Sequence, residues 1–250
     1  MTSPSFEYLA RLGDDRLVLG HRLSEWCGHG PILEEDIALA NIALDLIGQA
    51  NLFLALAGTA EGKGRDQDAL AYFREAIDYR NVLVVELPKG DFAFTIARQF
   101  LFSVFSYLQM ETLQKVKHKD LAGIAAKAVK ESKYHVRHSA EWMIKLGDGT
   151  DESHERAQAA VNELWRYTGE LFLADDVDRA AASAGAGVDP STLEGTWRSH
   201  VDDVFKRATL TVPDVKFMQR GGRTGKHTEH LGHMLAEMQI VARSHPGASW

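Results

Sequence analysis

Residues 33–57 read LEEDIALANIALDLIGQANLFLALA, and this stretch decides the fold. Apolar side chains recur in it at steps of three and four residues, interrupted only at Asn51, which is the pattern of one face of an α-helix. The residues of this face are Leu33, Ile37, Ala40, Leu44, Ile47 and Leu54. Most of the remaining circumference is filled by Leu39, Ile42, Leu46 and Phe53. A helix that is apolar nearly all round needs other helices to cover it, so the stretch predicts the central helix of a bundle.

A column of residues at helical spacing interrupts the apolar character of this helix. The column consists of Asn41, Asp45, Gly48 and Gln49. One interpretation is a row of metal ligands, or what remains of one. The other is a buried polar network that pairs with an arginine or lysine on a neighbouring helix, with Arg98 as the candidate partner of Asp45. We favour the second interpretation.

The composition is that of a globular chain with a substantial core. Of the 250 residues, 45% are apolar and 25% are charged. The 35 acidic residues outnumber the 28 basic ones, and the net charge of −7 makes nucleic acid and anionic lipid unexpected partners. The only cysteine, Cys27, forms no internal disulfide, and the chain does not start with a signal-peptide pattern, which favours the cytoplasm. Asn41, Asp45, Gln49 and Asn51 argue against a membrane span in the most apolar stretch.

The periodicity predicts a nearly all-helical fold, because no segment shows the repeated alternation of a sheet protein. Four long helices are expected at about residues 5–26, 33–57, 91–117 and 121–146. They make two hairpins joined by a crossover at residues 58–90, and two such hairpins packed together form a four-helix bundle. Within the crossover, residues 82–85 are apolar enough for a short buried strand. Asp91 and Asp120 are the expected N-caps of the third and fourth helices.

Further helices are expected after the bundle. A long one opens at Asp151, and shorter ones lie at about residues 175–183, 190–210 and 228–243. The loop at residues 211–225 is the least regular part. Without an internal repeat, the chain is predicted to be one domain, residues 1–250, with a core bundle at about 5–147 and additional C-terminal helices at about 151–244.

A bundle of two long hairpins is the architecture of ferritin-like di-metal proteins, in which two helices each supply a Glu and the other two a Glu-x-x-His pair. The chain has only parts of this pattern. Asp45 is followed three residues later by Gly48, which has no side chain to coordinate a metal, and Glu131 is followed by His135 after four residues. We therefore predict no metal or cofactor in this chain, and interpret Asp45, Glu131 and His135 as a vestigial site. The alternative is an autonomous di-metal oxidase that uses these three residues.

A basic, glycine-rich loop precedes the last helix. Arg220, Arg223 and Lys226 lie in it, and a flexible basic loop that leads into a helix N-terminus is an arrangement that binds phosphates. The loop lacks the strand and the first glycine of a Walker A motif. One hypothesis is therefore an anion contact, such as one to coenzyme A, and the other is a solvated or partner-facing loop.

Three histidines follow directly after this loop. His227, His230 and His233 are three residues apart, a spacing that can bind zinc. No fourth ligand converges on them in the sequence. A structural role is the favoured interpretation.

Several segments resemble, in order and over nearly the whole chain, the C subunits of bacterial phenylacetyl-CoA epoxidases. The most specific one reads LSEWCGHGP at residues 23–31 and continues as DIALANIALDL at residues 36–46. The other matching segments are residues 48–50, 126–131, 134–135, 146–151, 227–232 and 234–239. The resemblance is weakest at residues 58–69 and 180–187.

This resemblance implies a ferritin-like fold and membership of a multicomponent complex. In such a complex a sister subunit of the same fold carries the di-iron centre and epoxidises the aromatic ring of phenylacetyl-CoA with O2. The electrons come from NADPH through a separate reductase. The C subunit is the non-catalytic companion of the catalytic one. The resemblance therefore predicts a structural subunit without a cofactor of its own, with the catalytic subunit and the reductase as partners.

Overall fold

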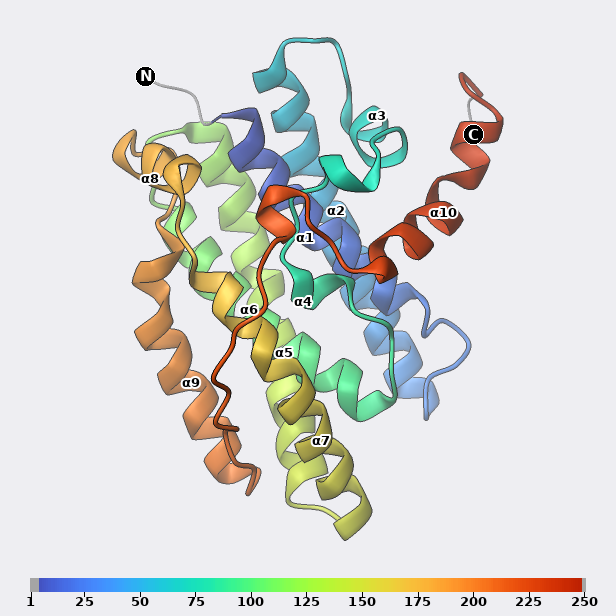
Figure 1. Ribbon diagram of the computed structural model, residues 1–250, viewed down its shortest axis with the longest axis vertical. Helices are drawn as coiled ribbons and strands as arrows, with labels where there is room; N and C mark the ends of the chain where they lie inside the picture. The colour runs from blue at the N-terminus through green and yellow to red at the C-terminus, as the bar shows by residue number, and fades with distance from the viewer. Residues whose placement is uncertain (1–4, 249–250) are drawn as a thin grey trace. The chain divides into compact units, whose positions relative to one another are not determined.

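The computed structural model describes residues 5–248, and over this range the chain is α-helical with no β-strand (Figure 1). Ten α-helices and four short 3₁₀-helices make up its regular structure. The contacts divide the chain into two compact units. The first, called the N-terminal unit, comprises residues 5–88 and 221–248, and the second, called the middle unit, comprises residues 89–220.

Two long helices form the centre of the N-terminal unit. α1 (Phe6–Ser24) and α2 (Leu33–Glu61) pack along their length as a hairpin, drawn in blue in Figure 1. The two backbones approach closely at Gly20 of α1, where an added Cβ would lie 2.8 Å from the Ile47 side chain. The predicted first hairpin is therefore confirmed.

Three further helices complete the N-terminal unit: α3 (Gln67–Tyr72), α4 (Leu83–Glu86) and α10 (Glu229–Ser244). α3 contacts both α2 and α10, and α4 contacts α1. Residues 82–85, which are apolar enough for a short strand, form no strand, because Leu83–Glu86 is the helix α4. The backbone N–H of Val82 donates to the Asp15 carboxylate at 2.9 Å instead of to a neighbouring strand.

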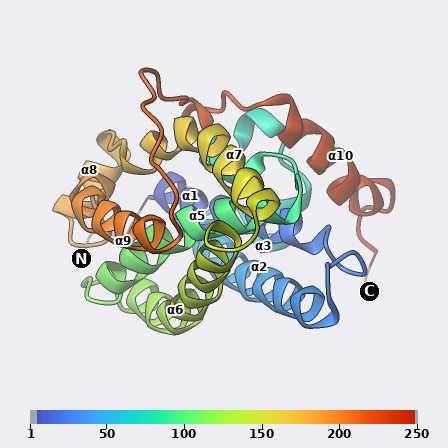
Figure 2. The same ribbon diagram turned by 90° about the horizontal axis from the view of Figure 1, so that it is seen from below.

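The middle unit contains five α-helices: α5 (Phe92–Leu113), α6 (Lys119–Gly147), α7 (Asp151–Thr168), α8 (Asp176–Ser183) and α9 (Glu194–Arg207). α5 packs against α6, α7 and α9 (Figure 2). Large aromatic rings fill the space between these helices. The ring of Trp197 packs on those of Trp165 and Phe172, and its Nε1 donates to the carbonyl of Leu101 at 2.9 Å. The third and fourth predicted helices are therefore confirmed as α5 and α6.

The two predicted N-caps of these helices have different outcomes. Asp91 caps α5 as expected, because its carboxylate accepts from the backbone N–H of Phe94 at 2.8 Å. The predicted cap at Asp120 is wrong. His118 caps α6 by accepting from the N–H of Leu121 at 3.3 Å. Asp120 lies in the first turn of α6, where its charge still favours the helix N-terminus.

The predicted single domain, with a core bundle at about residues 5–147 and C-terminal helices at about 151–244, stays a prediction. α7 continues the packing of α5 and α6 and belongs with them, whereas α10 contacts α3 in the N-terminal unit. The contacts place the limits of the middle unit at Lys89 and Arg220.

Within the described residues, α2 is the helix that is long and apolar enough to cross a membrane by length and composition. Half of its most apolar window, 50%, is buried inside the structure. A buried core helix passes the same test, and α2 packs against α1 along its length.

Candidate functional site

A row of six exposed, uncharged residues runs along five turns of one side of α2. This α2 stripe consists of Leu33, Ile37, Asn41, Leu44, Gly48 and Asn51. The three large apolar members, Leu33, Ile37 and Leu44, are 73%, 52% and 67% exposed. Steps of three and four residues keep all six on one line, about 27 Å long at a rise of 1.5 Å per residue. An exposed apolar row of this length is typical of a surface that another protein covers.

The α2 stripe corrects the expectation that its apolar residues are covered within the chain. The covered face is formed by Leu39, Ile42, Leu46 and Phe53, each at most 1% exposed. α2 is apolar on both faces, so the periodicity could not show which face lies inside.

The column that includes Gly48 is only partly buried. Asn41 and Gly48 lie in the exposed stripe, and a Cβ added at Gly48 would meet no atom within 4 Å. Gln49 is buried, and its Oε1 accepts from Nε of Arg16 on α1 at 3.0 Å. The predicted pairing with an arginine of a neighbouring helix is confirmed for Gln49 and wrong for the exposed Asn41.

Replacing Gly48 by alanine is expected to raise the free energy of unfolding by about 0.5–1 kcal/mol, because alanine restricts the unfolded chain and the added methyl group meets open space. Gly20→Ala is the matched control and should destabilise, since its Cβ would lie 2.8 Å from the Ile47 side chain. Urea unfolding of both variants checks this. A destabilising Gly48→Ala would show that this side of α2 is packed.

The vestigial-site candidates belong to different units. Asp45 is half-buried on α2 in the N-terminal unit, whereas Glu131 and His135 lie on α6 in the middle unit. His135 is buried, and the carboxylate of Glu131 lies 3.8 Å from Nζ of Lys127. Over residues 5–248, no three His, Cys, Asp or Glu side chains are grouped so that they could hold a metal ion. The pairing of Asp45 with Arg98 also joins residues of different units, and it stays a prediction.

Arg223, expected as an anion contact, binds a carboxylate of the chain itself. Its two terminal nitrogens donate to the two oxygens of Asp15 on α1 at 3.0 and 2.8 Å, and one of them donates to the carbonyl of Arg80 at 2.6 Å. The Asp15 side chain is fully buried and that of Arg223 is 15% exposed. Arg223 is thus part of the core of the N-terminal unit. Arg220 and Lys226 are exposed, and an anion contact at these two residues stays a prediction.

Two more arginines are buried in this region, Arg16 on α1 itself and Arg74, which contacts α1. Arg16 is 0% exposed and donates to the carbonyl of Leu12 at 2.9 Å. Burial lowers the pKa of Arg16 to about 10, and the neighbouring Asp15 carboxylate limits the fall. Arg74 forms an ion pair with Asp14, which is also fully buried. The middle of α1 is therefore an ionic core, in which each charge depends on residues far along the chain.

The N-terminus of α10 already holds an anion of the chain, the buried carboxylate of Glu86. It accepts from the backbone N–H of Thr228 at 2.6 Å and from Nδ2 of Asn81 at 2.8 Å. Nδ1 of His227 lies 2.7 Å from the same carboxylate, and Nε2 lies 3.1 Å from the carbonyl of Tyr79. Both ring nitrogens of His227 face oxygen acceptors of the chain, which suits the favoured structural role of this histidine.

The surroundings of His227 favour its protonated form. Burial lowers its pKa, but the hydrogen bond and charge of Glu86 outweigh burial, so the pKa lies above the usual 6.5. A pKa raised by folding stabilises the fold below the unfolded-state pKa, and this stabilisation is lost as the pH rises through the folded-state pKa.

His227→Gln is therefore expected to lower the free energy of unfolding more at about pH 6 than at about pH 9. Urea unfolding at both pH values measures the difference, and His245→Gln, at an exposed histidine, is the control. If His227→Gln lowers the free energy of unfolding equally at both pH values, the raised pKa of His227 is contradicted.

Comparison with known proteins agrees with this architecture. The chain matches the model of the family "Phenylacetic acid catabolic protein" over residues 1–250, and the fold of that family is ferritin-like. The chain is 49% identical over 243 residues to the C subunit of the 1,2-phenylacetyl-CoA epoxidase of Escherichia coli (strain K12). The match covers 97% of this chain and 98% of that protein. The chain therefore belongs to the phenylacetic acid catabolic protein family and has its ferritin-like fold.

Proposed function

We propose that the chain is the non-catalytic subunit of a multicomponent phenylacetyl-CoA epoxidase in the cytoplasm, and that it pairs with a di-iron catalytic subunit of the same fold. The observation that carries the proposal is the 49% identity, over 97% of the chain, with a protein named as the C subunit of such an enzyme. A subunit needs a surface that faces its partner. The α2 stripe is the surface that we assign to this contact.

The composition of the α2 stripe suits a contact between helices. Covering Leu33, Ile37 and Leu44 removes apolar area from water, which is worth about 25 cal/mol per Å². The six residues carry no charge that would have to be desolvated, and Gly48 lets a partner helix approach closely. A stable interface buries roughly 800 Å² on each partner. One stripe offers less than this, so it forms the centre of a larger interface.

The residues of this chain do not fit a di-iron centre, which supports the non-catalytic role. Ferritin-like centres take ligands from four helices, including a carboxylate and a histidine three residues apart on two of them. On α2 the position three residues after Asp45 is Gly48, which faces open space. On α6 the carboxylate of Glu131 lies near the ammonium group of Lys127. We therefore assign the redox chemistry to the partner subunit, supplied with electrons by a reductase.

Recovery of the complex tests this proposal. The tagged chain, produced together with the catalytic subunit, is expected to be recovered with it, and the iron content should follow the amount of the partner. The double variant Glu131→Gln with His135→Gln should contain the same iron and pair equally well. The competing function, a di-metal oxidase that uses Asp45, Glu131 and His135, requires about two irons in the isolated chain, lost in that variant. A chain that is recovered alone and holds iron would overturn the proposal.

A further inference from the structure

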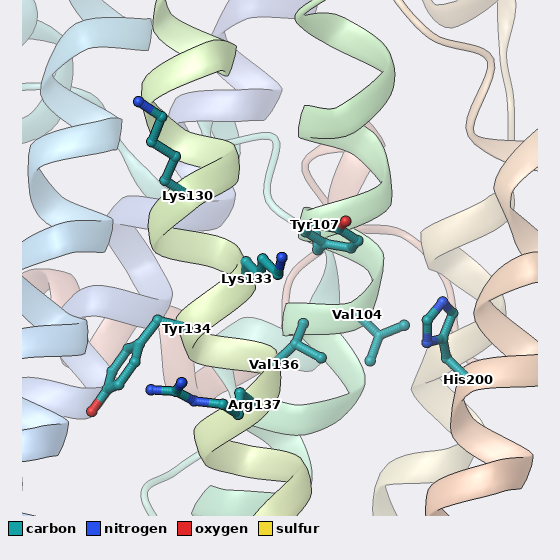
Figure 3. A pocket seen from close by; sticks show the side chains of 8 residues that line it. All are labelled: Val104, Tyr107, Lys130, Lys133, Tyr134, Val136, Arg137 and His200. Atoms are coloured by element: carbon teal, nitrogen blue, oxygen red, sulfur yellow. The ribbon is translucent and has the colours of Figure 1, made fainter.

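A pocket of about 520 Å³ opens on the middle unit between α5, α6 and α9 (Figure 3). Eight residues line it: Val104 and Tyr107 of α5, Lys130, Lys133, Tyr134, Val136 and Arg137 of α6, and His200 of α9. The volume lies within the range of roughly 300–1,000 Å³ that is typical of small-molecule sites. None of the residues of the α2 stripe lines this pocket.

The floor of the pocket is apolar and held in place by the core. Val104 is only 1% exposed, and Val136 and Tyr107 are half-buried. The hydroxyl of Tyr107 donates to Oε1 of Glu111 at 3.2 Å, which fixes the direction of the ring. These side chains offer an apolar and partly aromatic surface to a ligand.

The rim of the pocket is positively charged. Lys130, Lys133 and Arg137 follow one another on α6 at steps of three and four residues, so their charges repel one another. Among the residues that the structure describes, none of the three forms an ion pair with an acidic side chain, and no acidic residue lines the pocket. His200 faces them from α9.

The close-up view shows how these side chains are arranged. Lys133 lies next to Tyr107, and Val136 and Val104 are drawn below these two residues (Figure 3). Arg137 turns toward Tyr134, and its guanidinium lies 5.5 Å from the centre of that ring. Lys133 therefore lies beside Tyr107 and Val136, whereas Arg137 borders the pocket on the side of Tyr134, and no acidic residue lines the pocket between them.

We propose that this pocket binds an organic anion with an apolar or aromatic body. The anionic group, a carboxylate or a phosphate, pairs with Lys133 and Arg137, and the apolar body lies on Val104, Tyr107 and Val136. Charge-assisted hydrogen bonds to lysine and arginine hold such anionic groups more strongly than neutral ones do. Two sources share this chemistry, a free carboxylic acid and the thioester of that acid with coenzyme A. The proposal does not depend on the proposed pairing with a catalytic subunit.

Fluorescence titration of the purified full-length chain with anilinonaphthalene sulfonate, an aromatic anion, tests the proposal. The double variant Lys133→Gln with Arg137→Gln is expected to bind the probe about tenfold more weakly, which corresponds to about 1.4 kcal/mol. Both side chains are exposed, so the fold should be kept, and circular dichroism checks it. Lys119→Gln is the matched control. It lies at the exposed start of the same helix, about 21 Å from Lys133 at 1.5 Å per residue, and should bind the probe like the unmodified chain.

Competition then distinguishes the two sources. If phenylacetate displaces the probe, the ligand is a free acid. If phenylacetyl-CoA displaces the probe and phenylacetate does not, the ligand is a thioester. The proposal is overturned if the double variant binds the probe as tightly as the control does, or if neither compound displaces it. It is also overturned if only an acidic polypeptide, such as polyglutamate, displaces the probe, because the pocket would then be a protein contact.

Discussion

Replacing Asp15 by asparagine is expected to lower the free energy of unfolding of the chain by about 3–5 kcal/mol. The substitution keeps the shape of the side chain but removes the negative charge from a position that is 0% exposed. Arg223 then loses the carboxylate that accepts from both of its terminal nitrogens. Removing one partner of a buried ion pair lowers the free energy of unfolding strongly, because the other charge stays buried without its partner.

Arg16 adds to this loss. It is fully buried, its pKa is lowered to about 10 by burial, and the charge of Asp15 is what limits that fall. The nearby positive charge of Arg223 has the same effect as burial, because it also lowers the pKa of Arg16. Without Asp15, two guanidinium groups remain close together in the core with less negative charge between them.

Urea unfolding of Asp15→Asn measures this effect, and Asp202→Asn is the matched control. The carboxylate of Asp202 also accepts from an arginine, Arg198, at 2.8 Å, but its side chain is 51% exposed. Solvent screens such a surface pair, so its loss should change the free energy of unfolding by less than about 1 kcal/mol. If Asp15→Asn loses no more than Asp202→Asn, the ionic core of α1 does not stabilise the fold as we describe.

Replacing Leu44 by arginine is expected to weaken pairing with the catalytic subunit by about 30-fold or more, and to leave the isolated chain folded. Leu44 lies in the middle of the α2 stripe and is 67% exposed, so an arginine is accommodated in water. In the complex, the arginine would place a charge in an uncharged contact. Changes at the centre of an interface commonly cost 2 kcal/mol or more, which corresponds to about 30-fold in affinity.

A second exposed apolar residue gives the control for this variant. Phe217 is also 67% exposed, and it lies outside α2. Phe217→Arg should therefore pair like the unmodified chain. The two variants are compared by sedimentation or by calorimetric titration against the catalytic subunit. Native affinity for a folded Leu44→Arg chain would exclude the α2 stripe as the centre of the interface.

The long helices were predictable because their signals are local, although the start of α6 and the helix α4 were not. The three-and-four spacing of apolar residues predicted α2, and the Asp91 cap predicted the start of α5. Which face of α2 is covered was not predictable, because burial depends on elements distant in the sequence. Leu44 and Leu46 are equally apolar, yet one is 67% and the other 1% exposed.

The candidate site shows the same limit. A basic loop before a helix N-terminus has the same sequence pattern whether its anion is a ligand or a carboxylate of the chain. For Arg223 and Thr228 the anions are Asp15 and Glu86, which are 208 and 142 residues away in the sequence. A signal was nevertheless present. The charged run at residues 14–16 is flanked by the apolar residues Leu12, Leu17 and Val18, and such charges are rarely buried without partners.

The pocket of the middle unit was missed for a related reason. Lys130, Lys133 and Arg137 share one side of α6, which the sequence shows, but a row of cations on a helix usually faces solvent. The apolar floor comes from Val104 on α5, and the opposite wall comes from His200 on α9. Only the packing of three separate helices brings these parts together.

Epoxidation of phenylacetyl-CoA by reconstituted components, with and without this chain, tests the proposed role most directly. We predict that the catalytic subunit and the reductase reach full activity only when this chain is present, that iron is found in the catalytic subunit, and that Leu44→Arg fails to restore the activity. Full activity without this chain, or iron-dependent epoxidation by this chain without the catalytic subunit, would contradict the account.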